Sequence, residues 1–161
     1  MSNMNIKNLV IMVIIGAFAL ASCGDGVVHN ELTQAEKADG WELLFDGQTL
    51  DNWRDYNGEE LTIPWFVEDG MITAKGDGSD ETGYIVTKKE YENFIMKWEW
   101  KIADEGNSGV LYHVVENPKF KVPYVTGPEY QLIDELNFPE KLEDWQKTAA
   151  DYAMYTTDPA K

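Results

Sequence analysis

The sequence of 161 residues predicts an all-β protein, built as a β-sandwich or jelly roll around one core. The first observation is that short apolar runs alternate with turn residues along most of the chain. The second is segment 94–102, where apolar residues alternate with mostly charged ones with period two. One apolar face and one solvent-exposed face are typical of an antiparallel sheet.

Each expected element follows from local signals. Thr33-Gln34-Ala35-Glu36 has capping-box spacing and predicts a short helix that ends at Gly40. Asp69-Gly70 predicts a tight turn between two strands, and the glycines of 104–109 predict a second turn. The spacing of Leu142, Trp145 and Ala149 predicts a short amphipathic helix or a loop insertion within 139–150. The expected strands cover 41–45, 50–53, 65–67, 71–74, 84–87, 94–102, 110–116 and 129–134.

The composition excludes several classes of function. The chain has 13 basic and 29 acidic residues and a net charge of −16, which argues against nucleic-acid binding and against a basic patch for anionic lipid. Its one cysteine excludes a disulfide framework, and its two histidines leave little for a metal centre. Asp77, Asp80 and Glu81 resemble a calcium loop only loosely, because Thr82 stands where an EF-hand has glycine. We therefore expect no metal and no cofactor.

The N-terminal segment resembles an export signal. The charge-free run 9–20 is shorter than the roughly 20 residues that a membrane span needs. It ends in Leu20-Ala21-Ser22-Cys23, which is similar to a bacterial lipobox. We expect 1–22 to be a signal peptide, Cys23 to carry lipid and 23–31 to form a tether. The mature protein would then be held in the cell envelope, in the periplasm or at the outer-membrane surface; an uncleaved anchor helix is the alternative.

The solvent-exposed face of the predicted sheet holds the candidate residues for catalysis and substrate binding. Alternation places Glu99 there, and Glu129 and Gln131 join it if their strand packs its apolar side inward. Tyr112 and His113 are expected on opposite faces of 110–116. Carboxylates and amides exchange hydrogen bonds with hydroxyl groups, and aromatic rings stack on sugar C–H surfaces. The pattern therefore favours a carbohydrate partner, with neutral glycans preferred because the acidic surface repels acidic ones.

Structural interpretations of the same residues stay open. Glu99 between Lys97 and Lys101 is also typical of a cross-strand salt ladder. Asn107 and Ser108 also suit a turn closed by side-chain hydrogen bonds. Glu129 could be a turn carboxylate, His113 could be structural, and the tryptophans of 94–102 are expected in the core.

Several ordered motifs resemble one family. They are Gly40-Trp41-Glu42-Leu43-Leu44-Phe45-Asp46-Gly47, Leu50-Asp51-Asn52-Trp53, Trp98-Glu99-Trp100, Gly106-Asn107-Ser108-Gly109-Val110 and Gly127-Pro128-Glu129-Tyr130-Gln131. From about Leu32 to the end, the chain is similar to the 3-keto-disaccharide hydrolase domain family. The resemblance implies a concanavalin-like or laminin-G-like jelly roll, often found in exported lipoproteins of glycan-degrading bacteria. His113 departs from it, because relatives often carry Arg at that position.

The resemblance also implies an incomplete domain. Family members usually continue with a strand pair around Gly-Glu-Trp-Asn and a His-Trp-Leu-Asn-Gly hairpin, whereas this chain stops at Lys161. We expect 32–161 to be the N-terminal part of a longer domain. Open sheet edges and partly exposed Trp98 and Trp100 should then make it aggregation-prone alone.

The implied reaction is cleavage of a 3-keto-disaccharide or 3-keto-glycoside. The C3 ketone acidifies the C2 hydrogen, a base removes it, and the glycosidic oxygen on C1 leaves; water addition completes a hydrolysis, and without it the enzyme is a lyase. Candidate catalytic residues are Glu99, Glu129 and His113, and candidate substrate-binding residues are Asn107, Ser108, Tyr112 and Gln131. The alternatives are a paired-carboxylate glycosidase and a non-catalytic carbohydrate-binding module.

Overall fold

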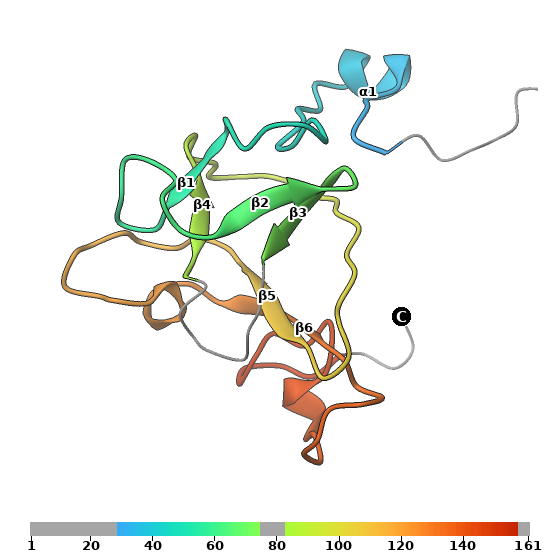
Figure 1. Ribbon diagram of the computed structural model, residues 1–161, viewed down its shortest axis with the longest axis vertical. Coiled ribbons are helices and arrows are strands. Elements are labelled where there is room, and N and C mark those ends of the chain that lie inside the picture. The colour runs from blue at the N-terminus through green and yellow to red at the C-terminus, as the bar shows by residue number, and fades with distance from the viewer. Residues whose placement is uncertain (1–28, 75–82, 158–161) are drawn as a thin grey trace, which may run out of the picture.

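The computed structural model describes residues 29–74 and 83–157. The elements in chain order are α1 (Gln34–Ala38), β1 (Trp53–Asp55), β2 (Trp65–Glu68), β3 (Met71–Ala74), β4 (Ile85–Thr87), β5 (Asn107–Leu111), the 3-10 helix η2 (Pro123–Val125), β6 (Glu129–Ile133) and the 3-10 helix η3 (Asp144–Gln146). In this part of the chain the strands form three antiparallel pairs, β1–β4, β2–β3 and β5–β6 (Figure 1). The all-β prediction is confirmed, and the jelly-roll sandwich stays a prediction.

Local signals explain the elements near the N-terminus. Thr33 and Glu36 form the predicted capping box, in which each side chain bonds the backbone N–H of the other residue. Asp69 and Gly70 both have positive φ, 50° and 72°, as a two-residue hairpin turn of type I′ requires. That turn joins β2 to β3, and their register sets Val67 opposite Ile72. The predicted helix and the predicted hairpin are therefore both confirmed.

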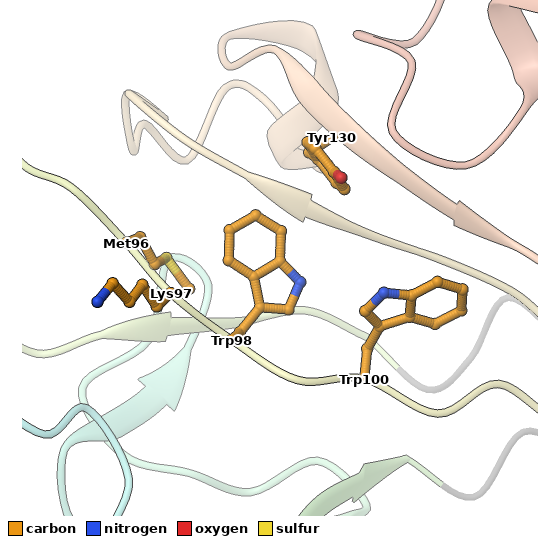
Figure 2. Close-up of a pocket in the computed structure, with 5 residues that line it drawn as sticks. All are labelled: Met96, Lys97, Trp98, Trp100 and Tyr130. Carbon is orange, nitrogen blue, oxygen red and sulfur yellow. The ribbon is translucent and has the colours of Figure 1, made fainter. Parts of the chain in front are cut away.

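Segment 94–102 is a correction, because it forms no strand. Its alternation survives only in part, with Trp98 and Trp100 on the side that faces Tyr130 (Figure 2). No described segment offers it a ladder of backbone hydrogen bonds, and alternation without a pairing partner does not make a strand. The expected core tryptophans are therefore 36% and 45% exposed.

Other predicted strands also differ from the structure, and the strand expected over 50–53 is replaced by β1, which begins only at Trp53. Segment 41–45 forms no strand, and the Leu44 carbonyl instead accepts a 2.9 Å hydrogen bond from the Trp53 indole. Strand β5 begins at Asn107 and ends at Leu111, because His113 has a left-handed φ of 51° that breaks the expected strand 110–116.

The region 139–150 contains only the short 3-10 helix η3 in place of an amphipathic helix. Ala149 has a φ of 68°, and the chain there turns back to pair with β6. The Gln131 backbone exchanges hydrogen bonds of 2.9 Å and 3.0 Å with Ala149 and Ala150. Strand β6 is thus held on both edges, by β5 and by 149–152.

The most deeply buried side chains are Pro123 of η2 and several residues on β6 and beside it. Gln131, Leu132 and Ile133 are 2%, 6% and 3% exposed, and Ala150 is fully buried. Within the described ranges, no helix is long and apolar enough to cross a membrane. The predicted signal peptide 1–22, Cys23 and the loose calcium-loop residues Asp77, Asp80 and Glu81 lie outside the described residues.

Candidate functional site

The β5–β6 pair gathers polar side chains on one face. Its register sets Asn107 opposite Ile133, Gly109 opposite Gln131 and Leu111 opposite Glu129. Opposed residues of an antiparallel pair point to the same side. Asn107, Glu129 and Gln131 therefore share one face, with Gly109 among them, and this set of four residues is called the polar face below.

Gly109 leaves the space that the Glu129 side chain fills. A Cβ atom at position 109 would overlap the Glu129 carboxyl group and lie 2.6 Å from its Cδ atom. Glycine is needed here for close approach rather than for backbone freedom, since no positive φ is involved. The carboxylate consequently leans across β5 toward the Asn107 side of the face.

Glu129 is partly buried, and its burial raises the pKa of its carboxyl group. Removing a carboxylate from water disfavours its charged form, which makes it a stronger base when it is ionised. A carboxylate with a raised pKa can accept a proton from a carbon acid at near-neutral pH.

Two amides stand beside this carboxylate. The Gln131 Nε2 atom donates a 3.3 Å hydrogen bond to the Asn107 Oδ1 atom. Gln131 is only 2% exposed, whereas Asn107 is exposed. The Gln131 Oε1 atom is buried without a hydrogen-bond partner in the described part of the chain.

The opposite face of β5–β6 is apolar and open. Trp98 packs edge-on against Tyr130 with ring centroids 5.0 Å apart. Figure 2 shows the Trp98 and Trp100 rings pointing toward Tyr130. The gap between them has a volume of about 260 Å³, and a neighbouring cavity of about 570 Å³ continues past Tyr112. This surface is called the aromatic face below.

Tyr112 and His113 both belong to the aromatic face, against the prediction that they lie on opposite sides. They line the larger cavity together, because the left-handed φ of His113 resets the alternation. The Tyr112 hydroxyl donates a 3.3 Å hydrogen bond to Asp151, and burial, with a smaller effect of Asp151, raises the Tyr112 pKa. The His113 ring lies 5.6 Å from the Phe94 ring.

Glu99 and Glu129 are not brought together. The Glu99 side chain is 71% exposed and bonds His29 Nδ1 near the N-terminus, whereas Glu129 lies on the polar face. The expected salt ladder around Glu99 is replaced on one side, because Lys97 stacks 4.3 Å from the Trp41 ring. Ser108 lies opposite Leu132 and therefore points to the aromatic side of β5.

The site that the structure supports is therefore the polar face. It offers a base, a buried amide and an exposed amide, a set that suits proton abstraction next to a carbonyl group. The described residues hold no cluster of three or more His, Cys, Asp or Glu side chains that could bind a metal ion. Sequence patterns missed Gly109 as part of the site, because the glycine also fits the predicted turn.

Three comparisons with known proteins extend this picture. Residues 40–161 match the family model described as a 3-keto-alpha-glucoside-1,2-lyase-like domain. A curated relative from Bacteroides thetaiotaomicron named 3-keto-disaccharide hydrolase is 31% identical over an alignment of 136 residues, and the match covers 76% of this chain and 47% of that protein. The chain thus spans about half the length of the curated relative that it matches.

A solved structure is also similar. A crystal structure of a candidate glycosyl hydrolase from Parabacteroides distasonis is 50% identical and superposes with a TM-score of 0.69. The likeness covers 79% of this chain and 59% of that one. At this identity and TM-score, the likeness supports the all-β fold of the chain.

Proposed function

The chain belongs to the family of 3-keto-alpha-glucoside-1,2-lyase-like domains, and we propose that it cleaves 3-keto-glycosides with Glu129 as the base. The observation that carries this proposal is the position of Glu129, partly buried, leaning over Gly109, with a raised pKa. The name of the curated relative supports the same substrate class.

The proposed reaction begins at a carbon acid. The Glu129 carboxylate takes the C2 proton, and the electron pair of that bond forms an enolate with the C3 carbonyl. When the carbonyl re-forms, a C1–C2 double bond forms and the C1–O bond breaks. Addition of water across the new double bond completes a net hydrolysis, whereas release before that step makes the enzyme a lyase.

The structure favours Glu129 over Glu99 for this task. Glu99 is largely exposed and bonds His29, and nothing beside it removes it from water. Glu129 shares its face with Asn107, an exposed amide that can hold a sugar hydroxyl or carbonyl, and with buried Gln131, which bonds Asn107. The partial burial of Glu129 raises its pKa, which is the direction of shift that strengthens a general base.

Turnover of a 3-keto-disaccharide by matched variants tests the proposal. Glu129→Gln removes the base and should lower kcat by at least about 100-fold. Glu99→Gln decides between the two candidate carboxylates and should leave kcat within a few fold of wild type. Glu68→Gln, at the exposed end of β2, is the control for loss of one negative charge. Wild-type kcat in Glu129→Gln would refute the assignment of the base.

The aromatic face favours one second candidate function, a non-catalytic carbohydrate-binding module. Its two tryptophans and Tyr130 line an open gap, and aromatic rings stack on the C–H surfaces of sugars. Binding of an unoxidised disaccharide that is lost in Trp100→Ala, without turnover of the 3-keto form by wild type, would favour this candidate.

We also propose that Cys23 anchors the protein in the cell envelope by lipid. The support is the sequence 20–23 alone. Cys23→Ala should move the protein from the membrane fraction to the soluble fraction of its host. Unchanged partition into membranes would count against the anchor.

A further inference from the structure

We propose that Asn107 donates a hydrogen bond to the ketone oxygen of the substrate and that buried Gln131 positions it for this task. The inference rests on the proposed function, and it divides two residues of the polar face into different roles. Asn107 touches the reacting group, whereas Gln131 acts only through Asn107.

Burial decides the role of Gln131. With 2% of its surface exposed, its amide cannot reach a substrate. Its backbone is fixed from both sides, because it pairs with Gly109 on β5 and with Ala149 and Ala150 on the other edge. A glutamine held this firmly can act only on its own neighbours.

The hydrogen bond between the amides fixes which way Asn107 faces. Gln131 Nε2 can only donate, so the Asn107 oxygen must turn inward to accept from it. The Asn107 Nδ2 group is then turned away from Gln131, and Asn107 is exposed. The pair therefore presents an N–H donor to solvent on the polar face.

The unpartnered Gln131 oxygen strengthens the inference. Buried polar atoms in native proteins nearly always have hydrogen-bond partners, and an exception needs an explanation. An apolar side chain would fill this position without an orphaned oxygen. A buried amide that leaves its oxygen unsatisfied indicates that the Nε2 donor of the same side chain is required.

The positions of donor and base match the reaction. The Glu129 carboxylate leans over Gly109, and Asn107 is the next residue along β5 on the same face. The ketone carbon C3 is bonded to C2, so a substrate whose C2 hydrogen faces Glu129 can direct its C3 oxygen to Asn107. As Glu129 takes the proton, negative charge moves to that oxygen and the Asn107 N–H stabilises it. The leaving C1 oxygen then takes a proton from water.

Isosteric variants of both residues test the division of roles. Asn107→Asp keeps the shape of the side chain but, when ionised, removes the donor, and it should lower kcat by about 100-fold. We expect KM to change much less, because the bond strengthens as charge develops on the oxygen. Asn52→Asp, an exposed asparagine beside β1, is the matched control for the added charge.

The Gln131 variants distinguish a positioning role from a merely structural one, because only a positioning role makes their effect on kcat depend on Asn107. Gln131→Met keeps the volume, frees Asn107 to rotate and should lower kcat about 10-fold. The double variant Asn107→Asp/Gln131→Met should be no slower than Asn107→Asp alone, because Gln131 acts through Asn107. If Gln131→Met does not fold, Gln131→Asn shortens the amide by one methylene and takes its place.

Wild-type kcat in Asn107→Asp, or multiplied effects in the double variant, would overturn the inference. The Glu129→Gln variant, measured alongside, separates the two failures. If Glu129→Gln is inactive while Asn107→Asp is unimpaired, only this inference fails. If Glu129→Gln is fully active, the proposed function itself fails.

Discussion

The two faces of the β5–β6 pair differ in both chemistry and packing. The polar face holds a partly buried carboxylate and two bonded amides, packed closely over Gly109. The aromatic face of the same strands is separated from segment 94–102 by a gap, and its tryptophans remain more than a third exposed. Neighbouring residues of a strand point to opposite sides. The residues proposed for catalysis and the residues that pack against segment 94–102 can therefore lie on different faces of one strand pair.

This comparison leads to a general expectation. Substitutions of the less buried members of the polar face, Asn107, Gly109 and Glu129, should change kcat with little loss of stability, and substitutions on the aromatic face should do the opposite. Gln131, which is 2% exposed, is the exception on the polar face. The following predictions test the expectation from the largest effect to the smallest.

Gly109→Ala should give the largest effect of the four. The new Cβ atom would overlap the Glu129 carboxyl group, which is the flexible end of a side chain and moves aside at little cost in stability. A displacement of about 1 Å at a reacting group lowers kcat by about 100-fold. The measurement is kcat together with the unfolding midpoint.

A rescue variant controls the Gly109→Ala experiment. Adding Glu129→Asp shortens the acid by one methylene and should recover part of the lost activity. Loss of the folded state in Gly109→Ala, or full activity, would contradict the account of this position.

Trp98→Ala should change stability rather than chemistry. It removes the edge-on contact with Tyr130 and part of the apolar surface of the gap. Because Trp98 is 36% exposed, we expect a loss of about 1–2 kcal/mol in the free energy of unfolding. Denaturant unfolding measures it. A large loss of kcat in a folded Trp98→Ala variant would show that the aromatic face also takes part in catalysis.

The pH dependence of stability should report the burial of Glu129. Burial raises its pKa in the folded state, so the unfolded chain releases this proton at lower pH than the folded protein does. Wild type should therefore lose stability relative to Glu129→Gln as pH rises from the unfolded pKa through the raised folded one. Thermal unfolding of both proteins across this window measures the difference. A difference in stability between the two proteins that stays constant at all pH values would show that burial does not raise the pKa of Glu129.

Tyr112→Phe should give the smallest effect. It removes the hydrogen bond to Asp151 on the aromatic face, and a single hydrogen bond contributes about 0.5–1.5 kcal/mol to stability. We expect kcat within a few fold of wild type, since Tyr112 lies on the face opposite Glu129. A strong loss of kcat would show that Tyr112 takes part in the reaction, as its prediction as a substrate-binding residue allows.

Local signals predicted the elements that depend on neighbours in sequence. The Thr33 capping box and the Asp69-Gly70 turn are examples, because each is defined within four residues. Segment 94–102 failed although its alternation was the clearest in the chain. A strand requires a second segment for its backbone hydrogen bonds, and a sequence pattern does not show whether one is in place.

In the candidate site too, local signals predicted some features, and others depend on contacts between distant segments. Alternation alone placed Glu129 and Gln131 on one face, and the structure has them there. The contact of Glu129 with Gly109, and of Gln131 with Asn107, depends on the register between β5 and β6. No local rule gives the register of two strands so far apart in sequence. The left-handed φ of His113 also places it on the same side as Tyr112, against expectation.

The central claim is that Glu129 removes the C2 proton, and isotope exchange tests it most directly. Turnover of a 3-keto-disaccharide in deuterated water by wild type should give a hydrolysed sugar with deuterium at C2 or, if the enzyme acts as a lyase, an unsaturated product with no hydrogen at C2. Glu129→Gln should incorporate no more than the uncatalysed exchange of substrate and product measured without enzyme. Incorporation by Glu129→Gln at the wild-type rate, or a wild-type product that keeps the original hydrogen at C2, would contradict the account.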